Sequence, residues 1–112
     1  GVGRIVEVVI GLGPDGHVAS LFPGRHQVSD TTLGAVAVHD SPKPPPLRVS
    51  LTLPVLNSAR SVLFIAAGRG KSAAVAAAHQ PGPALDCPAR AVRGRVETGW
   101  VLDEGAASEL GT

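Results

Sequence analysis

Residues 5–16 read Ile-Val-Glu-Val-Val-Ile-Gly-Leu-Gly-Pro-Asp-Gly, a nearly continuous run of β-branched residues that stops at a glycine. Such a run is typical of a buried strand that is apolar on both faces, as parallel strands usually are. The Gly, Pro and Asp residues at 11–16 then indicate a turn. A strand closed by a glycine-rich turn is a building unit of α/β folds, and the chain continues in the same way.

The rest of the chain alternates predicted strands and helices. We expect further strands at residues 35–38, 48–53, 61–67 and 98–102, and helices at residues 17–21, 54–60, 71–79 and 104–110. The proline-rich residues 41–46 predict a stiff, extended loop, because proline fits neither a helix interior nor a strand ladder. This alternation predicts an α/β fold in which helices flank a mostly parallel sheet.

Length and composition exclude several classes of protein. The chain has 112 residues, enough for one small domain but not for two. Its hydrophobic fraction of 44% and charged fraction of 17% exclude a disordered tail. No apolar run approaches the roughly 20 residues that span a bilayer, so we expect no membrane partner. A net charge of +1 leaves no broad footprint for nucleic acid, although one phosphate could be held locally.

The sequence gives no reason to expect a metal. Its single cysteine, Cys87, cannot form an internal disulfide or a cysteine cluster, and we interpret it as an ordinary small side chain. No pair of histidines has metal-ligand spacing on one predicted element. We interpret His26, His39 and His79 as surface or loop residues.

The turn after the first strand is the first candidate site. Ligands of open α/β sheets bind at the carboxyl ends of the strands, where this turn lies. His17 would begin a helix there, and a helix N-terminus favours the neutral ring that can accept a proton near pH 7. Asp15 could orient that ring. The alternative is an Asp-Gly turn with a histidine that merely caps the helix.

The basic residues Lys71, Lys43 and Arg48 are further candidates. Lys71 follows Gly68-Arg69-Gly70 at the end of the fourth strand, where backbone N–H groups and one ammonium could bind an anion; it could equally be a solvated residue of the first helical turn. Lys43 and Arg48 bracket the prolines, which would hold both cations rigidly. That segment could instead be a stiff surface connection or a ligand for an SH3-type module.

Four stretches resemble 6-phosphogluconolactonases. Residues 11–24 and 41–54 are similar to two signatures of this family, and residues 66–71 and 99–103 are similar to later blocks, in the same order. Glucosamine-6-phosphate deaminases share the glycine turn but continue with Phe-Asn-Glu-Pro, whose Glu takes part in catalysis. Here Ser20-Leu21-Phe22-Pro23 stands in that place, which favours the lactonase.

The resemblance implies a Rossmann-like fold and hydrolysis of 6-phospho-D-glucono-1,5-lactone to 6-phosphogluconate in the cytoplasm, in the pentose phosphate pathway, with no metal or organic cofactor. His17 would be the general base that activates water, and Asp15 would support it. Lys71 would contact the substrate phosphate. The substrate-binding residues that the resemblance implies are Gly11, Gly13, Lys43, Arg48 and Lys71.

The resemblance also implies that part of the domain is missing. Members of the family are roughly twice as long, still within the range of one domain. Their N-terminal half supplies a glycine-rich phosphate loop, an Asp-Glu-Arg segment and a substrate-binding arginine, none of which occurs here. We therefore interpret residues 1–112 as the C-terminal portion of one lactonase-like domain. The alternatives are a truncated, non-catalytic fragment and a module that binds a sugar phosphate without turnover.

Overall fold

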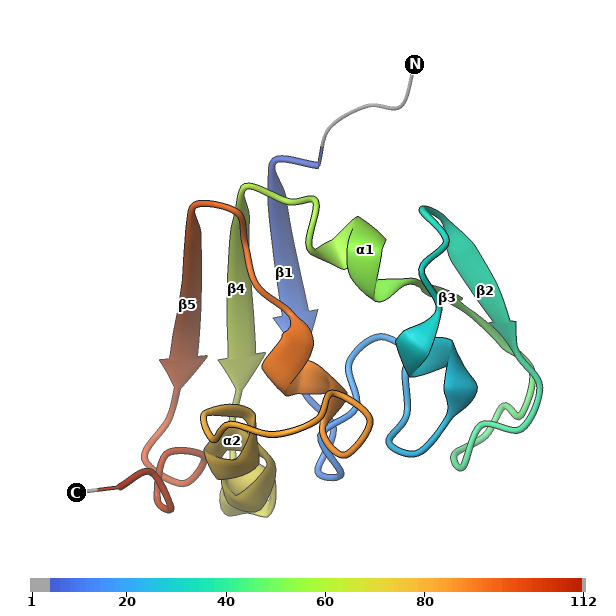
Figure 1. The fold of residues 1–112 in the computed structure, drawn as a ribbon. Coiled ribbons are helices and arrows are strands. Elements are labelled where there is room, and N and C mark those ends of the chain that lie inside the picture. Colours follow the sequence, from blue (N-terminus) through green and yellow to red (C-terminus); the bar gives the residue numbers. More distant parts are fainter. Residues whose placement is uncertain (1–4, 112) are drawn as a thin grey trace.

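A three-stranded parallel sheet forms the centre of the computed structural model, which describes residues 5–111 (Figure 1). Its strands are β1 (Glu7–Gly11), β4 (Ser61–Ala66) and β5 (Glu97–Leu102), and they lie in the order β1-β4-β5. The predicted strands at 5–10, 61–67 and 98–102 are confirmed. Residues 1–4 and 112, which the single-domain interpretation includes, lie outside the described residues.

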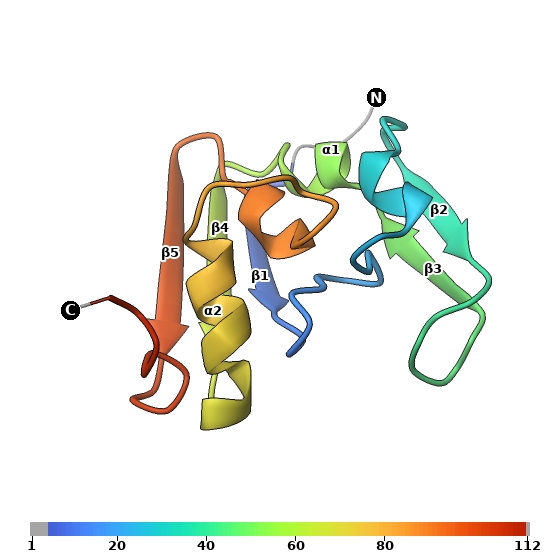
Figure 2. The same cartoon turned by 60° about the horizontal axis from the view of Figure 1, so that its bottom comes forward.

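One face of this sheet carries the helical segments. Helix α2 (Ser72–Ala78), preceded by the 3-10 turn η2 (Arg69–Lys71), and the 3-10 turn η3 (Pro88–Ala91) lie on the same side of the strands (Figures 1 and 2). Val62 and Phe64 of the central strand point to this side and are buried. The alanine-rich sequence explains why α2 forms, since alanine has the highest helix propensity.

The other face of the sheet is open within the described residues. Val9, Ile65 and Val101 are 59%, 47% and 53% exposed, respectively. Strands of parallel sheets are normally covered on both faces, which is why these positions are apolar in the sequence.

A separate antiparallel ribbon lies beside the sheet. It consists of β2 (Ala35–Val38) and β3 (Arg48–Leu51), joined by the proline-rich loop. Both strands were predicted, and the mostly parallel α/β fold is confirmed. What periodicity could not predict is that these two strands pair with each other and stay outside the parallel sheet.

Three predicted helices differ from the structure. Residues 17–21 form a tight turn because Ala19 has φ 51°, a left-handed value that no α-helix contains. The helix expected at 54–60 is only one turn long, α1 (Leu53–Leu56). Residues 104–110 form successive turns: one bond, from Ala107 to Asp103, spans four residues, but those from Ser108 to Gly105 and from Leu110 to Ala107 span three. The turns η1 (His26–Ser29) and η3 were not predicted.

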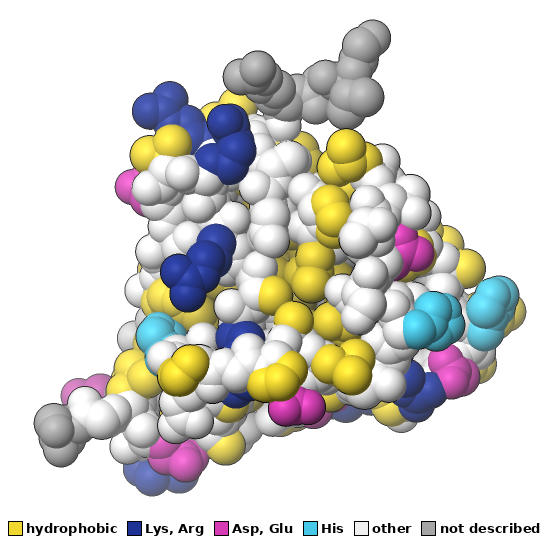
Figure 3. Space-filling model, in the orientation of Figure 1, with side chains coloured by type: hydrophobic (Ala, Val, Ile, Leu, Met, Phe, Trp, Pro, Cys, Tyr) yellow, Lys and Arg dark blue, Asp and Glu magenta, His cyan; other side chains and the backbone are white. Residues whose placement is uncertain are grey.

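The surface charges are scattered. Lys and Arg side chains lie at separate places on the face shown in Figure 3, between apolar and uncharged side chains. None of the helices between residues 5 and 111 is long and apolar enough to cross a bilayer.

Candidate active site

The loop after β1 holds His17 by its own backbone. The Gly13 N–H donates to the His17 carbonyl at 2.9 Å, and the Gly16 N–H donates to the Gly13 carbonyl at the same distance. The carboxylate oxygen Oδ1 of Asp15 accepts the His17 backbone N–H at 3.1 Å. These bonds close the loop locally, so that the position of the ring follows from the sequence Gly-Pro-Asp-Gly-His itself.

Asp15 also fixes the His17 ring. Its Oδ1 lies 2.6 Å from ring Nδ1. Partial burial raises the pKa of Asp15, but the hydrogen bonds from the backbone and ring of His17 outweigh this effect and leave the pKa below its ordinary value. An ionised carboxylate only accepts hydrogen bonds, so Nδ1 carries the proton and a neutral ring has its free lone pair on Nε2. The pair therefore has the geometry of a general base and its orienting group.

Gly13 is required where it is because the ring lies almost against its backbone. A Cβ at this position would be 2.0 Å from His17 Nδ1 and 2.8 Å from Asp15 Oδ1. Any side chain would displace the pair. By contrast, a Cβ on Gly11 would meet nothing within 4 Å, so open space surrounds that residue.

Lys71 reaches this loop from the end of β4. It is the last residue of η2, and its Nζ donates to the Leu12 carbonyl. The predicted anion pocket in the Gly68–Gly70 turn is wrong in one respect. The Gly68 N–H is already bound to Asp103, at 3.0 and 3.1 Å from the two carboxylate oxygens. The ammonium of Lys71 is thus the group that this turn contributes to the site.

These residues surround a cavity of about 590 Å³. The polar or charged side chains lining it come from three distant segments: His17 from the β1 loop, Lys43 from the proline loop and Lys71 from η2. Gly11 and Gly13 contribute their backbone, and Asp15 lies behind His17. Of the residues between 5 and 111, no carboxylate lines this cavity. The arrangement can attract an anion and offer it a base.

Arg48, unlike the expected cations Lys43 and Lys71, does not line the cavity. Its guanidinium donates to the carbonyls of Lys43, Pro44 and Pro45 and lies over the ring of Phe22. The helix-based argument for a neutral His17 also fails, because no helix begins there. Asp15 and the turn still orient the ring, as expected for Asp15.

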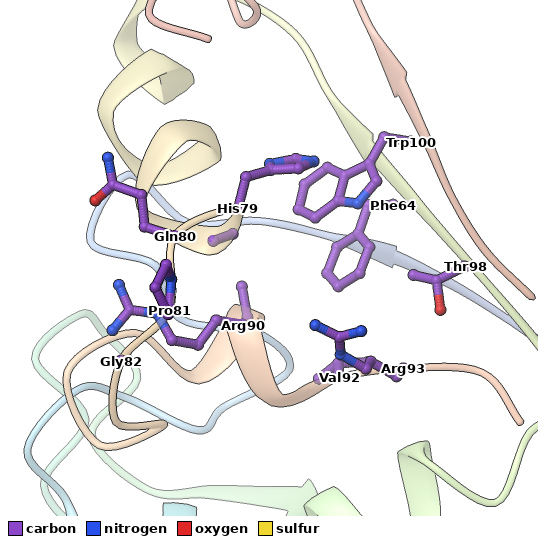
Figure 4. A pocket seen from close by; sticks show the side chains of 12 residues that line it. Phe64, His79, Gln80, Pro81, Gly82, Arg90, Val92, Arg93, Thr98 and Trp100 are labelled. Carbon is purple, nitrogen blue, oxygen red and sulfur yellow. The ribbon is translucent and has the colours of Figure 1, made fainter. Parts of the chain in front are cut away.

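A second cavity, of about 630 Å³, shares no residue with the first. Figure 4 shows Trp100 stacked on Phe64, with His79 pointing toward the indole; the ring centroids of His79 and Trp100 are 4.5 Å apart. His79 is exposed as expected, yet it belongs to this aromatic group. Arg90 at the rim donates to the carbonyls of Ala77 and Pro83, so it serves to join segments.

Within residues 5–111, no three His, Cys, Asp or Glu side chains gather as metal ligands. Cys87 is buried and unpaired with another cysteine, as expected for a small apolar side chain.

Comparison with known proteins gives the family. Residues 4–100 match the family described as glucosamine-6-phosphate isomerases/6-phosphogluconolactonase. The chain belongs to this family. It is 50% identical over 103 residues to a 6-phosphogluconolactonase of Streptomyces coelicolor, which covers 92% of this chain, and 44% identical over 106 residues to the human 6-phosphogluconolactonase.

A solved structure supports the same assignment. The crystal structure of 6-phosphogluconolactonase from Thermotoga maritima matches 90% of this chain with a TM-score of 0.79 and 32% identity. The match covers 44% of that chain, and the Streptomyces match covers 40% of that protein. The chain thus spans about two-fifths of the length of these members of the family.

Two contacts of the site escaped the sequence reasoning. Phe22 packs its ring against that of His17, with centroids 4.6 Å apart, and Leu12 provides the carbonyl that anchors Lys71. Phe22 could have been singled out, because it is one of only two phenylalanines and lies five residues after the histidine. The Leu12 carbonyl carries no signal in the sequence, since every residue has one.

Proposed function

We propose that the His17 cavity contributes to the hydrolysis of 6-phospho-D-glucono-1,5-lactone to 6-phospho-D-gluconate, a reaction of the pentose phosphate pathway. The observation that carries this proposal is the Asp15–His17 pair at a cavity that also holds Lys43 and Lys71. Several relatives are named 6-phosphogluconolactonase, which supports this choice of substrate. No cofactor is needed for the reaction.

His17 would act as base and then as acid. Nε2 takes a proton from water while the water oxygen bonds to C1 of the lactone, and the carbonyl electrons move to its oxygen. When the carbonyl re-forms, the bond from C1 to the ring oxygen breaks, and the imidazolium gives its proton to that oxygen. Asp15 holds Nδ1–H throughout and stabilises the imidazolium, as the acid does in a Ser-His-Asp triad.

The two lysines would hold the substrate phosphate. Lys71 uses one of its three N–H groups on Leu12, which leaves two for a phosphate oxygen. Lys43 adds a second cation from the proline-rich loop. Gly11 would let the sugar approach the backbone closely, because a Cβ there would meet nothing within 4 Å, whereas the space beside Gly13 is filled by the His17 ring.

We infer that a complete site needs further residues of the domain. The relatives are more than twice the length of the stretch that they share with this chain, and the face of the sheet with Val9, Ile65 and Val101 is uncovered here. Residues 1–112 are then one portion of a single domain. A non-catalytic fragment and a sugar-phosphate-binding module remain the competing proposals.

One assay separates these proposals. Hydrolysis of freshly prepared 6-phosphogluconolactone is followed by base uptake in a pH-stat, with the spontaneous rate subtracted, for the wild type and for His17→Ala. Turnover above the spontaneous rate that disappears in His17→Ala supports the enzyme. No turnover, but binding of 6-phosphogluconate seen by calorimetry, identifies a binding module. Neither turnover nor binding identifies an inactive fragment.

A further inference from the structure

We propose that Arg48 is a positioning residue that holds two separate parts of the cavity, Lys43 and His17, in one fixed relation. This inference deepens the proposed function and rests on it for its catalytic meaning. It assigns to Arg48 a task other than contact with the substrate.

The guanidinium of Arg48 binds three backbone carbonyls of the proline-rich loop. Its Nε donates to the Pro45 carbonyl at 3.1 Å, and Nη2 donates to the carbonyls of Lys43 at 3.0 Å and Pro44 at 2.9 Å. Prolines have no N–H, so such a loop can make few backbone bonds of its own. The guanidinium supplies the missing donors, and the backbone of Lys43 is one of the groups that it holds.

Arg48 has little donor capacity left for a ligand. A guanidinium has five N–H groups. Three of them donate to the loop carbonyls, and Nη1 lies 3.5 Å from Ser20 Oγ. A substrate phosphate would have to compete with these contacts, and Arg48 does not line the cavity.

The same guanidinium reaches the His17 side of the cavity. Its Cζ lies 5.5 Å from the centroid of the Phe22 ring, within the range of a cation–π contact. Phe22 in turn packs on the His17 ring at a centroid distance of 4.6 Å. Phe22 is fully buried, so its ring has little freedom to move away from either neighbour.

A second contact from β3 strengthens this link. Ser50, two residues after Arg48 and on the same side of the strand, accepts the Ser20 backbone N–H at 3.1 Å. The turn that carries His17 is therefore attached to two residues on one face of β3, Arg48 and Ser50. Lys43 and His17 come from loops that are 26 positions apart in the sequence, and Arg48 contacts both loops.

Lysine could not replace Arg48 in this arrangement. A single ammonium cannot donate to three carbonyls in a fork and also lie flat over an aromatic ring. Arg48→Lys keeps the charge and most of the side-chain length, so it removes the geometry and leaves the net charge of the site unchanged. Arg95→Lys is the matched control, because Arg95 donates through Nε to the Ser58 carbonyl and does not line the cavity.

The test measures position directly by NMR on the chain without ligand. We expect Arg48→Lys to change the chemical shifts of the His17 ring protons, which lie close to the Phe22 ring, and of the backbone amide of Lys43. Arg95→Lys should change neither. Phe22→Leu should shift His17 and leave the Lys43 amide in place, because the loop carbonyls keep their donor. Unchanged His17 and Lys43 signals in a folded Arg48→Lys protein would overturn the proposal.

A binding titration with 6-phosphogluconate separates this inference from the proposed function. If the wild type binds, we expect Arg48→Lys to weaken binding by about tenfold, as the loss of well-placed charged hydrogen bonds predicts. If the wild type does not bind but Arg48→Lys moves both signals, positioning holds and the function proposal fails. Weaker binding with both signals unmoved would make Arg48 a direct ligand and overturn the inference.

Discussion

Gly13→Ala is the most direct test of the geometry around His17. The added Cβ would lie 2.0 Å from Nδ1 and 2.1 Å from Cε1, whereas ordinary contacts begin at 3.4 Å. The ring must therefore retreat by about 1.4 Å. A displacement of about 1 Å at a reacting group costs on the order of 100-fold in rate, which corresponds to about 2.7 kcal/mol of barrier. We expect a loss of this size in the turnover of the lactone.

The assay needs a control that changes the backbone equally without touching the ring. Gly34→Ala provides it, because its Cβ would come no closer than 3.8 Å to Thr32, an ordinary contact, and Gly34 does not line the cavity. Both variants are compared in the pH-stat assay with freshly prepared lactone. The proton on Nδ1 of His17 is followed by NMR in the same samples, which reports the bond to Asp15 even where turnover is low.

The two readouts give a clear refutation. If Gly13→Ala folds and keeps both the wild-type rate and the Nδ1 proton signal, the ring does not lie where the structure places it. If the signal moves and a measurable rate stays at the level of Gly34→Ala, His17 is not the base. A loss of both, confined to Gly13→Ala, supports the reasoning.

Four other variants test the pair, the ligand contacts and the fold. The pKa of Asp15 lies below its ordinary 3.8, so its ionised form stabilises the fold above pH 3.8, and this contribution disappears as the pH falls through the lowered value. In urea unfolding, the stability of Asp15→Asn should therefore approach that of the wild type only in that acid range. A stability difference that stays constant with pH would contradict this prediction. Lys71→Gln should weaken 6-phosphogluconate binding in calorimetry by about tenfold or more, and equal affinity would remove Lys71 from the site. Phe64 is completely buried and stacks on Trp100 at 4.0 Å, so Phe64→Ala should lower the free energy of unfolding by about 3–5 kcal/mol, and a loss below about 1 kcal/mol would argue against this core. Gly94→Ala should destabilise as well, because its Cβ would lie 2.1 Å from the Glu97 carbonyl, and an unchanged melting temperature would contradict that contact.

Strands β1 and β4 of the parallel sheet were predictable because each contains an apolar run that ends at a glycine or a turn. Residues 61–66 are apolar at all but one position, as is typical of a parallel strand, and Val62 and Phe64 are buried on one face of the sheet. The helix expected at 17–21 was wrong because the left-handed backbone of Ala19 comes from the packing around it, with Val18 and Leu21 both fully buried. Local propensity contains no such information.

The residues of the site likewise divide into those that the sequence predicts and those that the packing decides. The sequence by itself determined the Asp15–His17 pair, because the two residues are two positions apart and a glycine turn closes on its own hydrogen bonds. It also indicated Lys71 at the end of a neighbouring strand, since parallel strands present their carboxyl ends at one edge.

Only the tertiary structure decided what the other cations do. Lys43 and Arg48 each carry one positive charge and flank the same prolines, yet Lys43 lines the cavity and Arg48 turns into the loop. The difference arises because the guanidinium of Arg48 lies between the carbonyls of its own loop and the Phe22 ring, and that ring comes within reach only when β3 packs beside the β1 loop. Bonds between near neighbours can be inferred from spacing, whereas the partners of a long side chain depend on segments that the fold brings together.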